Sequence, residues 1–130
     1  MNKLRYALIF FLTITGLLFP VNLVVKPYLQ NATPNSIHIL WETDSYTESI
    51  LEWGMYVFLT EQIVGSSIVN YGNSRIHTAQ LTNLEPSTRY YYRVKYENEY
   101  SDLYNFITPP LASSEDAFRI VAMSDMQRDN

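Results

Sequence analysis

The sequence predicts an all-β fold, a sandwich of two antiparallel sheets with Greek-key connections. Three observations favour it: aromatic residues make up 15% of the chain with eleven tyrosines, apolar and polar residues alternate in several short segments, and turn residues separate those segments. Flat rings pack well on a pleated sheet, and a period of two is typical of a half-buried strand. We therefore expect about seven short strands.

The clearest of these patterns lies in residues 84–94. Pro86 fixes its own φ and favours an extended conformation for the residue before it, which predicts a tight corner. Beyond the corner, Tyr90, Tyr92 and Val94 share one face of a strand. A tyrosine in this position buries its ring and returns its hydroxyl to nearby backbone. The pattern resembles the tyrosine corner of fibronectin type III domains, which implies an immunoglobulin-like or fibronectin type III-like sandwich.

Residues 1–23 form the first predicted unit. Lys3 and Arg5 precede an apolar run from Tyr6 to Phe19, an order typical of a secretory signal. The run is shorter than the roughly twenty residues that a membrane-spanning helix requires. We expect a signal peptide that is removed, or an uncleaved N-terminal anchor as the alternative. Either predicts a secreted, periplasmic or cell-surface protein that meets a membrane only through this segment.

Residues 24–108 are predicted to form the sandwich itself. An edge strand is expected from Val24 to Gln30, because Pro27 cannot donate to a ladder. In the next strand, Ser36 to Thr43, the alternation makes Trp41 the central core residue.

The later strands are expected at Ser49–Gly54, Arg75–Leu81, Tyr90–Tyr96 and Leu103–Ile107. Between Met55 and Val69 the pattern does not set a register, and Val57–Leu59 and Gln62–Val64 are the candidate short strands.

Several polar and aromatic residues are candidates for a site. His77 is expected to be a hydrogen-bonded structural histidine rather than a ligand, and His38 to be solvated. Four carboxylates gather around one turn, and a polar end of the sandwich explains them better than acid/base catalysis: Glu42, Asp44, Glu48 and Glu52. Four tyrosines suggest either an aromatic platform for sugars or a neighbouring domain, or simply strand propensity: Tyr91, Tyr96, Tyr100 and Tyr104.

Charge and cysteine content exclude some functions. The net charge is −4 and no block of Lys or Arg occurs, so binding to nucleic acid through phosphate contacts is not expected. The chain has no cysteine, which excludes disulfides, thiolate chemistry and Cys-type zinc sites.

The last part of the chain changes character. Residues 109–117 are rich in Pro, Ser and acid and are predicted to be a linker. Phe118–Met123 is a near-continuous apolar run, as in the first strand of an α/β domain that is covered on both faces. Asp125 follows it, where such folds place ligands and metals. An Asp after a strand is more often a helix cap or a turn residue.

Several motifs in order resemble a known family. Lys26–Ile37, Leu40–Thr43, Leu51–Gly54 and His77–Leu84, followed by the tyrosine corner, are similar to the N-terminal domain of purple acid phosphatases. Residues 118–127 resemble the opening strand and first metal motif of the calcineurin-like metallophosphoesterase domain.

This resemblance implies an exported phosphoesterase with a dinuclear metal centre, iron paired with iron, zinc or manganese, acting on a phosphorylated small molecule or protein. There the metals activate a water or hydroxide that attacks phosphorus. Asp125 matches the first metal ligand of the family. Gln127 departs from the pattern, which has Gly in purple acid phosphatases and His in many relatives, so its role as a ligand is in doubt.

The later motifs of the family are missing from the 130 residues. We therefore expect a fragment or truncated product with no catalytic residues, which binds no cofactor tightly and hydrolyses nothing. Its partner would be its own missing catalytic domain. The alternative is a free-standing exported binding module of fibronectin type III type, with residues 118–130 as a mere tail.

Overall fold

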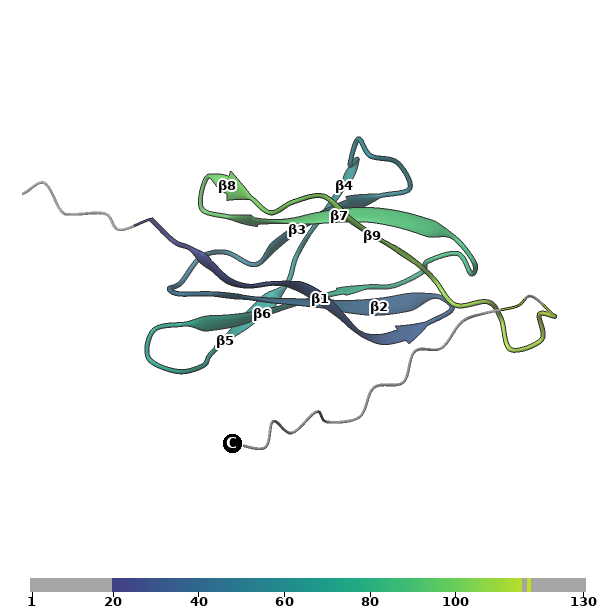
Figure 1. Ribbon diagram of the computed structural model, residues 1–130, viewed down its shortest axis with the longest axis horizontal. Helices are drawn as coiled ribbons and strands as arrows, with labels where there is room; N and C mark the ends of the chain where they lie inside the picture. The colour runs from purple at the N-terminus through teal and green to yellow at the C-terminus, as the bar shows by residue number, and fades with distance from the viewer. Residues whose placement is uncertain (1–19, 116, 118–130) are drawn as a thin grey trace, which may run out of the picture.

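All the regular structure in the part of the chain that the computed structural model describes, residues 20–115 and 117, is β (Figure 1). The strands are β1 (Leu23–Thr33), β2 (Ser36–Thr43), β3 (Ile50–Gly54), β4 (Glu61–Val64), β5 (Ser66–Val69), β6 (Arg75–Leu81), β7 (Arg89–Tyr96), β8 (Glu99–Tyr100) and β9 (Tyr104–Ile107). One antiparallel sheet has the order β1-β2-β6-β5. The other has the order β4-β3-β7-β8, with β9 also paired to β7. The predicted two-sheet sandwich is confirmed.

The core lies between the inner faces of the two sheets. Its buried residues include Ile37, Ile39 and Trp41 from β2, and Tyr92 and Val94 from β7. These are the alternate positions that the sequence pattern predicts for the inward face. Among the described residues, every buried member of this cluster lies between residues 37 and 106.

The tyrosine corner forms as predicted between β6 and β7. The ring of Tyr90 is 2% exposed, and its hydroxyl accepts a hydrogen bond from the backbone N–H of Glu85 at 2.9 Å. Ser87 within the corner has a φ of 51°, which completes the tight reversal. The bond ties the buried tyrosine to the backbone at the start of the corner.

The edge strand β1 is longer than the sequence predicts. It runs to Thr33 rather than ending at Gln30, and its pairing with β2 shifts register three times. Asn31 has a φ of 51° close to the last shift. Asn tolerates this conformation, so the strand continues through a bulge to the hairpin tip instead of turning at Asn31.

The structure of the segment between β3 and β5 differs from the sequence prediction. Val57–Leu59 is part of the β3–β4 loop and not a strand, because β3 finds its neighbour in β4 at Glu61–Val64. The next strand, β5, was not predicted. Gly65 alone separates β4 in one sheet from β5 in the other, and a Cβ there would lie 2.1 Å from the carbonyl oxygen of Thr78. Only glycine permits so close a crossing between the sheets.

The sandwich has two ends, which we name after the start of β1 (the N-terminal end) and the exit of β9 (the C-terminal end) (Figure 1). The N-terminal end, on the left of Figure 1, holds the start of β1, the β2–β3 loop, the β5–β6 turn and the β7–β8 turn. The C-terminal end, on the right, holds the β1–β2 hairpin tip, the tyrosine corner and the exit of β9. The described residues contain no helix long and apolar enough to cross a membrane.

Candidate functional site

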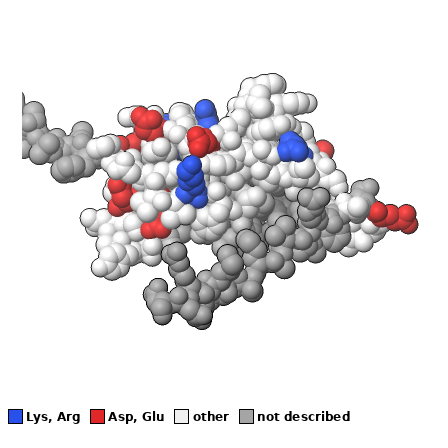
Figure 2. Space-filling view, in the orientation of Figure 1, with Lys and Arg blue, Asp and Glu red and all other residues white. Residues whose placement is uncertain are grey.

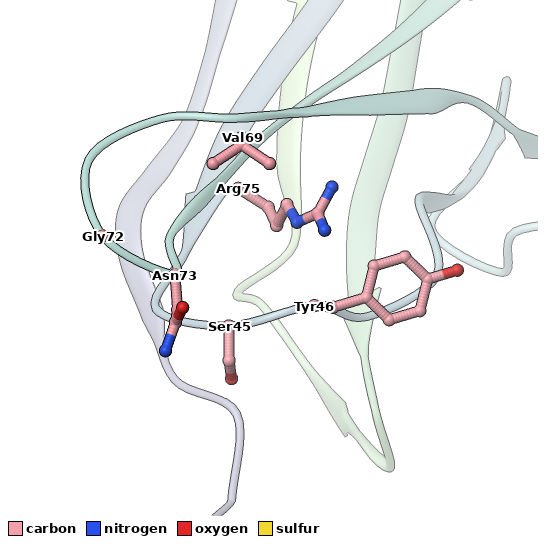
Figure 3. A pocket seen from close by; sticks show the side chains of 6 residues that line it. All are labelled: Ser45, Tyr46, Val69, Gly72, Asn73 and Arg75. Atoms are coloured by element: carbon pink, nitrogen blue, oxygen red, sulfur yellow. The ribbon is translucent and has the colours of Figure 1, made fainter.

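The N-terminal end of the sandwich carries a cleft of about 270 Å³ (Figure 3). The β2–β3 loop forms one wall and the β5–β6 turn forms the other. Its lining residues are Ser45, Tyr46, Val69, Gly72, Asn73 and Arg75.

Local backbone geometry opens this cleft. Gly72 has a φ of +64°, a conformation that residues with a Cβ rarely adopt. It allows the chain to turn between Asn70 and Ser74, where Asn70 N–H donates to the carbonyl of Ser74 at 2.9 Å. Arg75 then starts β6 directly opposite Thr43 of β2, so its side chain projects at the rim of the core.

A cation–π contact shapes the cleft. The guanidinium carbon of Arg75 lies 5.3 Å from the ring centroid of Tyr46, and the ring itself is 68% exposed. An aromatic face, a guanidinium, a hydroxyl and an amide together suit the binding of a polar ligand. No pair of nucleophile and base lies among the six residues that line the cleft.

Two of the predicted acidic residues lie near this end and are held ionised. The backbone N–H of Asn22 donates to Asp44 and lowers the pKa of that carboxyl, helped by the Asn22 amide at 2.8 Å. The amide of Asn70 donates to Glu42 at 2.8 Å and lowers its pKa in the same way. Glu52 instead pairs with Arg93 on the neighbouring strand β7 of the same sheet, at 2.7 Å. These three acids therefore have separate partners and form no catalytic pair.

His77 sits in the core just inside the cleft and is fully buried. Its ring stacks on Trp41 with centroids 5.1 Å apart. Its Nε2 lies 2.7 Å from the hydroxyl of Thr43, and its Nδ1 lies 2.8 Å from the hydroxyl of Ser49. The Thr43 hydroxyl donates its single proton to the carbonyl of Ser45 at 2.8 Å.

These contacts fix the tautomer of the neutral ring. Because Thr43 has already donated its proton, Nε2–H of His77 donates to it, and in the neutral ring Nδ1 then accepts from the Ser49 hydroxyl. Burial, followed by the charge of Arg75, lowers the pKa of His77 to about 4. The prediction of a structural histidine is confirmed, since both ring nitrogens are used within the core.

The structure decides two other sequence hypotheses. The four tyrosines lie on β7, β8 and β9, as strand propensity predicts. Tyr104 lies opposite Tyr92 and packs against the core, whereas Tyr100 lies on the outer face beneath Arg93 at 3.9 Å. The four tyrosines therefore form no common platform. His38 is half-buried rather than solvated, and its Nδ1 is buried with no hydrogen-bond partner in the described part of the chain, because neighbouring strands flank it on both sides.

The predicted metal residues, Asp125 and Gln127, lie outside the described residues. Within residues 20–115 and 117, no group of three or more His, Cys, Asp or Glu side chains is arranged to hold a metal ion. The described residues therefore do not fit a dinuclear metal centre, which needs several protein ligands for each ion.

With this geometry in place, comparison with known proteins becomes informative. A family model described as "Purple acid Phosphatase, N-terminal domain" matches residues 24–108, well over half of the chain. The chain belongs to this family. The purple acid phosphatase N-terminal domain thus coincides with the sandwich from β1 to the end of β9. No curated protein sequence matches the chain.

Solved structures agree on the fold of this purple acid phosphatase N-terminal domain. The long form of the sensor domain of the anti-sigma factor RsgI4 from Pseudobacteroides cellulosolvens is 23% identical, with a TM-score of 0.54, covering 76% of this chain and 99% of that one. Its short form is 21% identical, with a TM-score of 0.51, covering 72% and 99%. At this identity the likeness shows a shared β-sandwich and nothing further.

Sequence reasoning missed the cleft at the N-terminal end. Its residues come from a loop and a turn that are far apart in the chain, and only the pairing of β5 with β6 brings them together. The one available signal was an aromatic residue, Tyr46, inside a polar loop.

Proposed function

We propose that this purple acid phosphatase N-terminal domain is the accessory, non-catalytic domain of an exported metallophosphoesterase. It is joined through residues 109–117 to a catalytic domain that opens at Phe118. The observation that carries the proposal is the family match over residues 24–108, followed directly by a Pro-rich linker and an apolar run that leads to Asp125.

The residues of this chain would hydrolyse no phosphoester by themselves. The substrate, a phosphorylated small molecule or protein, and the dinuclear centre of iron with iron, zinc or manganese both belong to the downstream domain. Asp125 is proposed as one ligand of that centre. Gln127 is the weaker proposal, because an amide oxygen binds a divalent ion less well than a carboxylate.

Export rests on the first 23 residues. The basic start and the apolar run from Tyr6 to Phe19 direct the protein to a secreted, periplasmic or cell-surface location. Because the chain has no cysteine, it forms no disulfide that would need an oxidising compartment. The sandwich is therefore stabilised by its core alone.

A phosphatase assay tests the proposal. Residues 20–130 and the product of the gene read past Asn130 are each assayed with p-nitrophenyl phosphate in the presence of iron, zinc or manganese. We expect no hydrolysis by residues 20–130, and hydrolysis by the longer chain that Asp125→Asn abolishes. Hydrolysis by residues 20–130, or a longer chain that is inactive with every metal, would refute the proposal.

The cleft beside Tyr46 favours a second candidate, a free-standing binding module. A polar ligand would bind in the cleft that Tyr46 and Arg75 line together. Limited proteolysis separates the two candidates. Rapid trimming from Phe118 onward, with the sandwich intact, supports the binding module, whereas resistance of that segment supports the accessory domain.

A further inference from the structure

The β3–β4 loop exposes four consecutive apolar side chains, which we call the apolar loop. Met55 is 40% exposed, Tyr56 and Val57 are each 62% exposed, and Phe58 is 66% exposed. The rings of Tyr56 and Phe58 stack on each other, 5.2 Å apart and inclined by 8°. Scattered exposed apolar residues are ordinary, but a contiguous group of this kind marks an interaction site.

The apolar loop itself carries no charged side chain. In Figure 2 the projection that corresponds to the β3–β4 loop is free of blue and red atoms, whereas acidic side chains gather toward the N-terminal end. A surface without charged groups is suited to an apolar partner, because no ion has to be desolvated when it is covered.

The apolar loop lies at the same end as the exit of the chain. β3 ends at Gly54 opposite Tyr91 of β7, and Tyr91 is in turn opposite Asn105 of β9. Gly54 and Asn105 are therefore two strand spacings apart, about 10 Å, and β9 ends two residues beyond Asn105, at Ile107. Ile107 and Leu111, each 54% exposed, extend the apolar surface along the exit.

The chain itself supplies an apolar segment within reach. Phe118–Met123 follows Leu111 by seven residues, a stretch that spans at most roughly 25 Å when extended. As a single strand in water, this segment would leave its apolar side chains exposed, so we expect them to pack against another surface. A short covalent linker also raises the effective concentration of the segment near the loop to the order of mM, so even a small contact would be populated.

A membrane is a poorer occupant. The start of the described chain is tied to the N-terminal end, where Val21 N–H donates to Glu97 at 3.3 Å and Asn22 N–H donates to Asp44 at 3.0 Å. A bilayer that held the N-terminal segment would therefore face the end of the sandwich away from the apolar loop.

We propose that the apolar loop, Met55–Phe58, is the surface against which the segment Phe118–Met123, the first strand of the downstream domain, packs one of its two apolar faces. This rests on the proposed accessory function and deepens it, by naming the surface of the sandwich that the start of the downstream domain contacts. The stacked rings of Tyr56 and Phe58 form the centre of the contact.

Paramagnetic broadening tests the docking directly. Because the chain has no cysteine, a spin label attached to Val57→Cys in residues 20–130 is the only one present. We expect it to abolish the amide signals of Phe118–Met123. The control label on Tyr71→Cys, a position 91% exposed in the β5–β6 turn at the other end, should leave those signals intact.

A matched pair of double variants distinguishes docking on the apolar loop from non-specific hydrophobic association. Adding Tyr56→Ser and Phe58→Ser to the Val57 label should restore the signals of Phe118–Met123. Adding Ile68→Ser and Val69→Ser, which remove side chains 65% and 58% exposed on β5, should not restore them.

Three results would overturn the proposal: signals of Phe118–Met123 that survive the Val57 label, broadening that passes between labelled and unlabelled molecules in a mixed sample, or broadening of the loop by anionic phospholipid vesicles. The second would assign the loop to another copy of the chain, and the third to a lipid surface. The phosphatase assay is independent of this readout, so failed docking and a failed accessory function are distinguishable.

Discussion

The two ends of the sandwich are fastened by different chemistry. At the N-terminal end the buried ring of His77 joins Thr43 to Ser49. At the C-terminal end two hydroxyl groups make the corresponding hydrogen bonds. The Tyr90 hydroxyl accepts from Glu85 N–H, and the Thr108 hydroxyl donates to the Glu85 carbonyl at 2.6 Å. Imidazole titrates near neutral pH and hydroxyls do not, so acid should loosen only the first end.

The ends also differ at their surfaces. The N-terminal end has a cleft in which Arg75 and Tyr46 face each other, with ionised acids nearby. The C-terminal end carries the uncharged apolar loop beside the exit of the chain. A polar cleft and an apolar loop at opposite ends suggest two separate contacts, one with a ligand and one with the downstream domain.

Removal of the buried imidazole should have the largest effect. His77→Ala leaves the hydroxyls of Thr43 and Ser49 without their partner and opens a cavity beneath Trp41. We expect the free energy of unfolding to fall by about 3–5 kcal/mol, measured by urea denaturation followed by Trp fluorescence. His38→Ala, on the outer face, should cost less than about 1 kcal/mol. Equal losses for the two variants would mean that the network does not fasten this end.

Acid should selectively weaken the N-terminal end. The pKa of His77 is lowered to about 4 in the folded chain from 6.5, so the unfolded chain takes up the proton first as the pH falls. The stability is complete above pH 6.5 and is lost as the pH falls toward 4, by on the order of 2–3 kcal/mol. Urea denaturation between pH 7 and pH 4 measures the loss.

Two variants sharpen this pH experiment. His77→Gln removes the titrating ring, so its stability should stay nearly constant between pH 6.5 and pH 5, above the range in which Glu42 and Asp44, whose pKa values are lowered in the folded chain, take up protons. Arg75→Gln removes a charge that helps to lower the pKa of His77, so the loss in acid should become smaller. If the free energy of unfolding of the wild-type chain changed with pH as little as that of His77→Gln, the pKa of His77 would not be lowered in the folded chain.

The C-terminal end should lose less from a single deletion. Tyr90→Phe keeps the buried ring and removes only the hydroxyl that accepts from Glu85 N–H. We expect a loss of about 1–2 kcal/mol that is the same at pH 7 and at pH 5. Tyr91→Phe, on the outer face of β7, is the control and should be nearly neutral. A pH-dependent loss for Tyr90→Phe would remove the contrast between the two ends.

The smallest effect on stability is expected at the apolar loop. Tyr56→Ser with Phe58→Ser replaces exposed side chains that pack on each other rather than on the core. The free energy of unfolding of residues 20–115 should change by no more than about 0.5 kcal/mol. A loss of several kcal/mol would show that the loop supports the fold and is not reserved for a partner.

Much of the fold could be predicted because its causes are local. Alternation in β2 and β7 assigned the inward faces, and Pro86 with Tyr90 predicted the corner. The segment from Met55 to Val69 could not be resolved in this way. Val57 and Phe58 have side chains that favour strands, but β3 pairs with Glu61–Val64 instead.

By itself, the sequence determined which faces of the strands are apolar and where the corner lies, because side-chain period and turn chemistry act within a few residues. Tertiary structure alone decided the crossing between sheets at Gly65, the cleft between Tyr46 and Arg75, and the exposure of the apolar loop. Each of these features depends on which strands pair with each other. That pairing is stabilised jointly by residues that lie far apart in the sequence.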